Sequence, residues 1–175
     1  MPYAITLRLD AEAASFIEAL WRALASRGIS DEALRLGYPP HLTLAVYPDS
    51  ADRGRLIAAA RGVATHWRAL PITLASLGVF PGTPATMFLA PVVTPALLAL
   101  HAELLSSLVG ELVDAHYQLG HWVPHVTLAS DLANPATAIA ALDPAGFPIV
   151  GVLDTMEAVR FRPVQVLESR RLADA

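Results

Sequence analysis

The chain has 175 residues, of which 54% are hydrophobic and 16% charged, a composition typical of one globular domain and not of a disordered segment. It contains no cysteine, which excludes disulfide bonds, thiolate metal sites and cysteine nucleophiles. All twelve basic residues are arginine and the net charge is −4, which argues against a broad basic surface for long nucleic acid.

Strands and helices are predicted to alternate along the chain. Strands are indicated where apolar residues recur at every second position, as Ile5, Leu7 and Leu9 do. Helices are indicated where apolar residues follow the helical period between a capping residue and a glycine, as between Asp10 and Gly28. In chain order, the predicted elements are a strand over 3–9, a helix over 10–28, a strand over 41–47, a helix from Asp49 or Ser50 to Trp67, strands over 71–80 and 86–93, a helix over 95–109, a strand over 125–130, a short helix over 135–142, and strands over 149–161 and 164–172.

No segment is predicted to carry the chain into a membrane or out of the cell. The first residues lack the basic region and apolar core of a signal peptide. The uncharged stretch over 83–101 is interrupted by Pro84, Pro91 and Pro95, which leaves pieces too short to span a bilayer. We therefore expect a cytoplasmic protein.

One short motif occurs twice, as PPHLTLAVYP over 39–48 and as VPHVTLASDL over 123–132. The two histidines, His41 and His125, are 84 residues apart, which is close to half of the chain. Internal duplication is the economical explanation of so long a period. It predicts a single domain over 1–175 made of two similar lobes, about 1–85 and 86–175, with strands exchanged between them.

The repeated motif places a histidine and a threonine on one face of each strand. Side chains two positions apart share a face, so His41 lies beside Thr43, and His125 lies beside Thr127. In-line displacement at phosphorus needs a base on the attacking oxygen and an acid on the leaving oxygen, and histidine serves either role near neutral pH. The hydroxyls can donate to the non-bridging oxygens. This mechanism requires neither a metal nor a cofactor.

These paired motifs resemble those of the 2H phosphoesterase superfamily, and specifically those of the 2′-5′ RNA ligase and RNA 2′,3′-cyclic phosphodiesterase family. The segments AITLRLD, LGVFPGTPATMFLAPV and HWVPHVTLA are also similar to that family. The resemblance implies an α+β, duplicated two-lobe fold with two antiparallel sheets facing across a central cleft and helices on the outer faces. It implies that His41 and His125 are the acid–base pair and that Thr43 and Thr127 hold the phosphate. Which histidine is the base depends on which oxygen leaves.

Three further residues are predicted to bind the substrate. Arg8 opposes the apolar face of the first strand, and Arg160 shares a face with Arg162 near the end of the chain. Phe80 lies where the family's middle hairpin borders the cleft, and it could stack on a base. A solvated arginine and a packed phenylalanine are the alternatives. Arg8, Phe80 and Arg160 are the predicted substrate-binding set.

The function expected from these features is metal-independent hydrolysis of 2′,3′-cyclic phosphates on nucleotides or RNA ends, together with reversible 2′-5′ RNA ligation. The expected partner is a nucleotide or an RNA-end phosphate, with no membrane and no obligatory protein partner. The acidic net charge favours a small nucleotide or an RNA end over a large RNA. One alternative is a nucleotide-binding module with little turnover, and another is a zinc hydrolase that uses His121 and His125.

Overall fold

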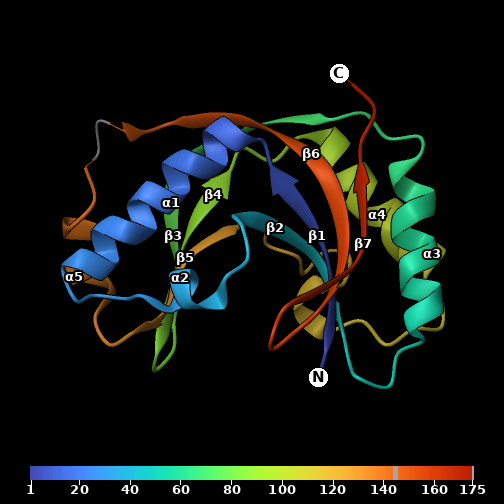
Figure 1. Cartoon of the computed structure of the whole chain (residues 1–175), viewed down its shortest axis with the longest axis horizontal. Coiled ribbons are helices and arrows are strands. Elements are labelled where there is room, and N and C mark those ends of the chain that lie inside the picture. The colour runs from blue at the N-terminus through green and yellow to red at the C-terminus, as the bar shows by residue number, and fades with distance from the viewer. Residues whose placement is uncertain (144–145, 175) are drawn as a thin grey trace.

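The computed structural model describes residues 1–143 and 146–174. The predicted strands and helices occur in the predicted order, and the structure adds the short helix α2 and the 3-10 turn η1, which were not predicted (Figure 1). The elements are β1 (Tyr3–Leu9), α1 (Ala11–Ser26), α2 (Glu32–Leu36), β2 (His41–Tyr47), α3 (Arg53–Ala64), β3 (Leu70–Phe80), β4 (Ala85–Pro91), α4 (Pro95–Ser107), the 3-10 turn η1 (Ala115–Tyr117), β5 (Val126–Leu132), α5 (Pro135–Ala140), β6 (Ile149–Arg160) and β7 (Gln165–Arg171).

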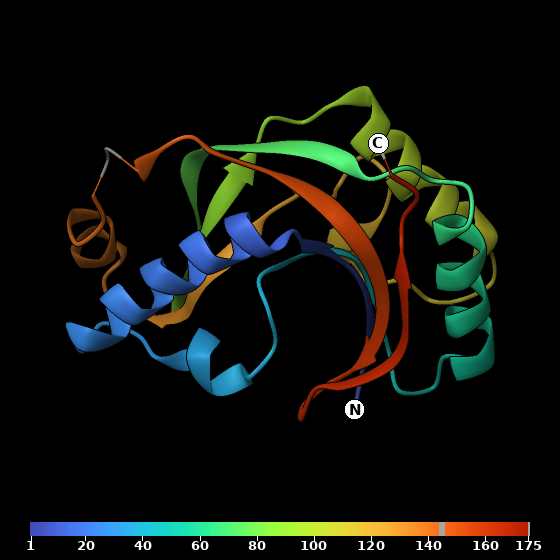
Figure 2. The ribbon, with the colours of Figure 1, turned by 45° about the horizontal axis from the view of Figure 1, so that its top comes forward.

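The seven strands form one antiparallel sheet in the order β2-β1-β6-β3-β4-β5, with β7 paired to β6. The long strands β3 and β6 pair with each other and run across both halves of the molecule (Figure 2). The predicted α+β fold with two lobes is confirmed, and its two sheets are halves of one sheet that are joined through β3 and β6. The division of the chain near residue 85 stays a prediction.

The helices lie at the two ends of the molecule. Figure 1 shows α3 and α4 together beside β1, β2 and β7, whereas α1 and α5 lie beside β3, β4 and β5. Helix α1 therefore follows β1 in the sequence but packs on the other half of the sheet. Among the residues described, no helix has the length and apolar content that a membrane crossing needs.

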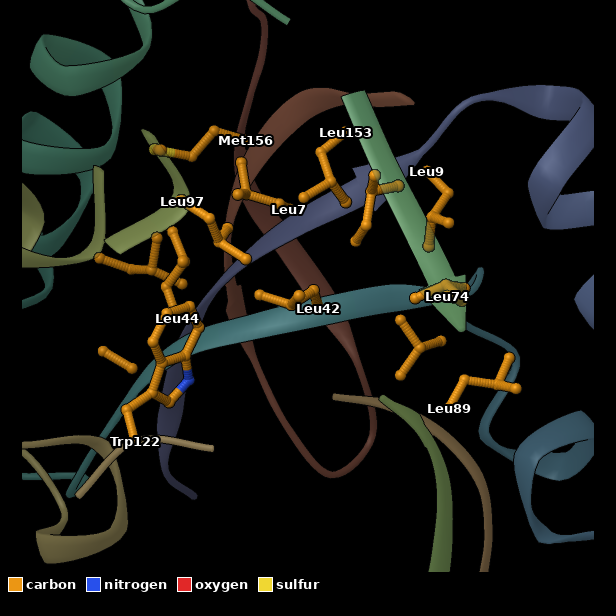
Figure 3. Close-up of a cluster of buried hydrophobic side chains, with 14 of the residues drawn as sticks. Leu7, Leu9, Leu42, Leu44, Leu74, Leu89, Leu97, Trp122, Leu153 and Met156 are labelled. Carbon is orange, nitrogen blue, oxygen red and sulfur yellow. The ribbon is translucent and has the colours of Figure 1, made fainter. Parts of the chain in front are cut away.

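The core explains why β1 and β2 have one apolar face and one polar face. Leu7, Leu42 and Leu44 are fully buried and meet side chains from β3, β4, β6 and α4 (Figure 3). Because successive side chains of a strand point to opposite faces, Thr6 and Thr43 lie on the face away from this core. The polar face is the one that carries the motif residues.

The start of the second long helix differs from the prediction. Asp49 and Ser50 lie in a turn, and α3 begins at Arg53 after the capping residue Asp52. The Asp52 carboxylate accepts hydrogen bonds from the backbone N–H groups of Gly54 and Arg55, which have no partner within the helix. Three capping residues stand within four positions of the sequence, so the pattern alone did not select the right one.

Candidate active site

The two motif strands lie at the two ends of the strand order and contact each other across the molecule. Both strands carry the same irregularity, because the pairing register shifts after Thr43 in β2 and after Thr127 in β5. Such a bulge turns two successive residues toward the core. The residues that follow the threonines are accordingly buried in both strands: Leu44, Ala45, Leu128 and Ala129.

Both motif histidines make the same backbone contact. Nδ1 of His41 lies 2.8 Å from the carbonyl oxygen of Pro39, and Nδ1 of His125 lies 2.8 Å from that of Val123. A carbonyl oxygen can only accept, so each Nδ1 carries a hydrogen and each neutral ring has an unprotonated Nε2. Within residues 1–143 and 146–174, neither Nε2 has a hydrogen-bond partner. Each imidazole is therefore oriented to exchange a proton at Nε2.

Burial lowers the pKa of both imidazoles below the ordinary value for histidine. For His41, the hydrogen bond to the Pro39 carbonyl opposes this effect, and the nearby charge of His125 lowers the pKa further. For His125, the hydrogen bond to the Val123 carbonyl raises the pKa, and the nearby charge of His116 lowers it. His125 is thus close enough to His41 to lower the pKa of that ring.

Two tryptophans hold the motif strands through their indole N–H groups. Nε1 of Trp21, on α1, donates to the carbonyl oxygen of Thr127 at 3.1 Å. Nε1 of Trp122, just before β5, donates to the carbonyl oxygen of Thr43 at 3.0 Å. Neither tryptophan was among the predicted site residues. Each motif strand is therefore held by a residue from the other half of the chain.

We expect Trp21→Phe and Trp122→Phe each to lower the free energy of unfolding by about 1–3 kcal/mol, because each leaves a buried carbonyl without its donor. Denaturant unfolding monitored by circular dichroism measures the change. Trp67→Phe is the matched control, since Nε1 of Trp67 donates to the partly exposed Glu103 and its loss should cost less. An equal loss of stability in all three variants would contradict a special role for the two motif contacts.

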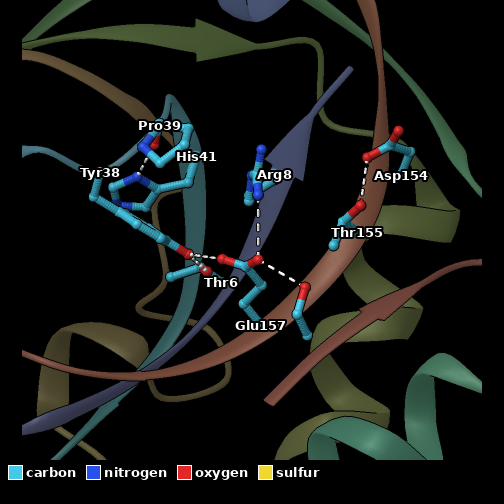
Figure 4. A network of polar contacts seen from close by, with 9 residues as sticks. Thr6, Arg8, Tyr38, Pro39, His41, Asp154, Thr155 and Glu157 are labelled. Carbon is cyan, nitrogen blue, oxygen red and sulfur yellow. Dashed lines mark hydrogen bonds and ion pairs between the residues drawn. The ribbon is translucent and has the colours of Figure 1, made fainter. Parts of the chain in front are cut away.

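A buried polar network supports His41 from one side (Figure 4). The Tyr38 ring lies 4.7 Å from the His41 ring, and its hydroxyl donates to Oε2 of Glu157 at 2.6 Å. Glu157 is only 2% exposed, and Oε1 accepts a hydrogen bond from Nη1 of Arg8 at 3.3 Å. Burial and the bond to Glu157 raise the pKa of Tyr38, which stays a neutral donor. Two further hydroxyls complete the network, those of Thr6 and Ser169.

Aromatic rings surround His125 instead. Phe80 and Phe88 are stacked with centroids 4.3 Å apart, and they lie 4.9 Å and 5.3 Å from the His125 ring. His116 is a third ring neighbour, 6.1 Å from His125. A Cβ at Gly78 would lie 2.3 Å from Phe88 ring atoms, so only glycine leaves room for this ring. His41 therefore lies beside a polar network, whereas His125 lies among aromatic rings.

A cavity of about 200 Å³ lies between the motif strands. His41, Thr43 and Thr127 line it, whereas His125 lies beside it and is not part of its lining. Neither threonine hydroxyl has a hydrogen-bond partner among the described residues. Two free hydroxyls and an imidazole in one cavity can bind a tetrahedral anion. Its remaining lining residues include Ala4, Glu32, Leu36, Val46, Ser130, Val159, Arg162 and Val164.

Two of the three predicted substrate-binding residues lie beside the motif histidines. Arg8 is paired with His41 across β1 and β2, and its side chain is 37% exposed while it contacts Glu157. Phe80 packs edge-on against His125 and is partly buried. Neither residue lines the cavity itself, so their contact with substrate stays a prediction.

The third, Arg160, is not brought to the cavity. Its Nη2 lies 3.4 Å from Oδ1 of Asp49, and its guanidinium is 6.0 Å from the centre of the Tyr3 ring. Val159 occupies the cavity side of β6 instead, so the neighbouring Arg160 points to the opposite face. Arg162, two residues beyond Arg160, is the arginine that lines the cavity.

No group of three or more His, Asp or Glu side chains is placed to hold a metal ion in the part of the chain that the structure describes. His121 is exposed in a turn and is not on a helix with His125. His101, on α4, is buried and stacks on Trp122 with centroids 4.0 Å apart. Its Nε2 lies 3.0 Å from the carbonyl oxygen of Tyr117.

Residues 9–162 match the sequence model of the 2′-5′ RNA ligase superfamily, and the chain belongs to this superfamily, within the 2H phosphoesterases. No curated protein matches the sequence.

Solved structures share the fold over nearly the whole chain. A phosphoesterase crystal structure is 19% identical, with a TM-score of 0.69 and 98% of each chain covered. TT0787 of Thermus thermophilus is 22% identical, with a TM-score of 0.66 and 99% of each chain covered. LigT of E. coli, crystallised with 3′-AMP, is 19% identical, with a TM-score of 0.64 and coverage of 97% of this chain and 96% of LigT.

Proposed function

We propose that the protein hydrolyses 2′,3′-cyclic phosphates on nucleotides or RNA ends by paired-histidine catalysis, and that it also carries out reversible 2′-5′ ligation, in which the 5′-hydroxyl of a second RNA attacks phosphorus in place of water. The observation that carries the proposal is the repeated geometry of His41 and His125. Both rings donate through Nδ1 to a backbone carbonyl and leave Nε2 without a partner in the described structure. Membership of the 2′-5′ RNA ligase superfamily and the nucleotide in the LigT structure support a nucleotide phosphate as the substrate.

The residues divide the chemistry between them. One motif histidine removes a proton from water as the water oxygen attacks phosphorus, and the other donates a proton to the ribose oxygen as its bond to phosphorus breaks. The hydroxyls of Thr43 and Thr127 donate to the non-bridging oxygens, where negative charge accumulates. The product is a 2′- or 3′-monophosphate, and the ribose oxygen that left phosphorus becomes a hydroxyl.

The direct test is hydrolysis of 2′,3′-cyclic mononucleotides by the wild-type protein with a chelator present. We expect turnover to a single monophosphate isomer, which chromatography of the products identifies. The same assay on a short RNA that ends in a cyclic phosphate distinguishes a nucleotide from an RNA end as the preferred substrate. Binding of both compounds without turnover of either would favour the nucleotide-binding module and contradict the proposed hydrolase.

The alkaline limb of the pH profile of kcat/KM should be displaced to lower pH. Because burial lowers the pKa of both histidines, the free protein holds little of the required protonated ring at pH 7. We expect kcat/KM to rise as the pH falls from 8 and to reach its maximum below about 6.5, the ordinary histidine pKa. A bound phosphate anion raises the histidine pKa values, so the maximum of kcat should lie at higher pH. A kcat/KM that keeps rising to pH 8 would contradict this assignment.

A further inference from the structure

The cavity has a second polar region beyond the motif threonines. Glu32, Ser130 and Arg162 line it there, from α2, β5 and the segment after β6 respectively. The Glu32 carboxylate accepts a hydrogen bond from the Ser130 hydroxyl through Oε2 and one from Nη2 of Arg162 through Oε1, the latter at 2.9 Å. The Glu32 side chain is 22% exposed, and that of Arg162 is 66% exposed. The partly buried Glu32 carboxylate thus has one solvent-exposed partner, Arg162.

The position of this carboxylate follows from the bulge in β5. The bulge turns Leu128 and Ala129 toward the core, so Ser130 is the next residue after Thr127 that faces the cavity. Ser130 and Thr127 lie about 7 Å apart along the strand. Glu32 lies next to Ser130 and accepts the hydrogen bond that the Ser130 hydroxyl donates. A phosphate held by the threonines therefore places the far part of its nucleotide against Glu32.

Most of the remaining lining of the cavity is apolar. Its aliphatic side chains are Ala4, Ala33, Leu36, Val46, Val159 and Val164, and its aromatic side chains are Trp21, Tyr38, Tyr117 and Phe161. Flat, apolar walls suit the faces of an aromatic ring, whereas a second phosphate would meet a negative charge at Glu32. The ligand group that fits this region is a planar ring with hydrogen-bond donors on its edge.

We propose that Glu32 and Arg162 recognise a guanine base, which makes the protein selective for guanosine 2′,3′-cyclic phosphate or an RNA end with a terminal guanosine. The inference rests on the proposed function of the motif residues. Guanine presents N1–H and N2–H₂ side by side, so both can donate to one carboxylate, and its O6 acceptor beside them suits an arginine donor. Adenine and cytosine offer a single amino group, and uracil offers a single N–H.

The repeat supports a specific role for this region. Ser130 occupies the place in the second motif that Val46 occupies in the first, three residues after the threonine, and both line the cavity. The Ser130 hydroxyl therefore has no counterpart in the first motif. Its hydrogen bond, which holds the Glu32 carboxylate against the cavity, explains this difference between the two motifs.

The test is calorimetric titration with 3′-GMP, 3′-AMP, 3′-CMP and 3′-UMP, followed by kcat/KM on the four 2′,3′-cyclic nucleotides. For the wild type we expect at least about a tenfold preference for guanine in both measurements, the size of one good bidentate contact. Glu32→Gln should reduce the preference for guanine to less than about threefold. Asp31→Asn removes the same charge from the neighbouring residue, which pairs with Arg35 outside the cavity, and should keep the preference.

The outcomes separate this inference from the proposed function. Equal binding of the four monophosphates by the wild type, or an unchanged preference in Glu32→Gln, would overturn the guanine site even if hydrolysis is efficient. Guanine-selective, Glu32-dependent binding without turnover of any cyclic nucleotide would support the base site and overturn the hydrolase. Failure to bind any of the four would overturn both.

Discussion

Replacing either motif histidine should abolish most of the turnover of a 2′,3′-cyclic nucleotide. We expect His41→Ala and His125→Ala each to lower kcat by about 10²- to 10⁴-fold, the usual contribution of a positioned acid or base. Each removes a ring that is fixed by a backbone carbonyl and has a free Nε2 in the described structure. Steady-state kinetics with a chelator present measures the loss, and calorimetry with a nucleotide monophosphate checks that binding survives.

His121→Ala is the matched control, because His121 is exposed and lies only four residues before His125. It should retain full activity, and a large loss would instead favour a hydrolase that uses His121. The double variant of His41 and His125 should be only a few-fold below the weaker single variant, since residues that act as a unit are not additive. Wild-type activity in either single variant would make the repeated motif structural.

Removing a motif hydroxyl should lower kcat more than it weakens binding. We expect Thr43→Val and Thr127→Val each to reduce kcat by about 10²-fold, by analogy with the loss of one donor to an oxyanion. Valine keeps the shape and the strand preference of threonine, so the fold should be unchanged. Neither hydroxyl has a partner among the described residues, which leaves both available to the substrate.

Thr43→Ser and Thr127→Ser test whether the hydroxyl itself is responsible. Both should recover at least about a tenth of the wild-type kcat, because the donor is restored while the methyl group is lost. Circular dichroism confirms that each valine variant is folded. A valine variant with normal kcat and a raised KM would show that its hydroxyl contributes only to binding.

The repeated motif and the alternation of apolar residues predicted the strands closely, because both patterns involve only residues that are near one another in the sequence. The alternation around His41 and His125 fixed two strands and the face that carries each threonine, and the structure has both. The bulge after each threonine was not predicted, although two successive buried residues in the repeated TLA are consistent with it. Alternation cannot reveal a position at which the period of two is interrupted.

Side chains that contact the motifs from far away in the sequence were not predictable. Glu157 lies 116 residues from His41 and is one of three charged residues in β6, yet it contacts both Tyr38 and Arg8 beside that ring. Alternation correctly placed Arg160 and Val159 on opposite faces of the strand. It did not show which of the two faces the cavity. That choice depends on the pairing of β6 with its neighbours, which no local pattern contains.

The exchange of tryptophans between the halves has a consequence for the origin of the protein. Trp21 and Trp122 each hold the motif strand of the opposite half, and α1 packs on the half of the sheet that its own strand does not belong to. Neither half alone can therefore present a finished site. If the repeat descends from a gene of half this length, its product needed two copies that swapped helices, and fusion joined the two copies in one chain. Once fused, the two copies were free to differ, which is how one histidine gained a carboxylate network and the other gained aromatic neighbours.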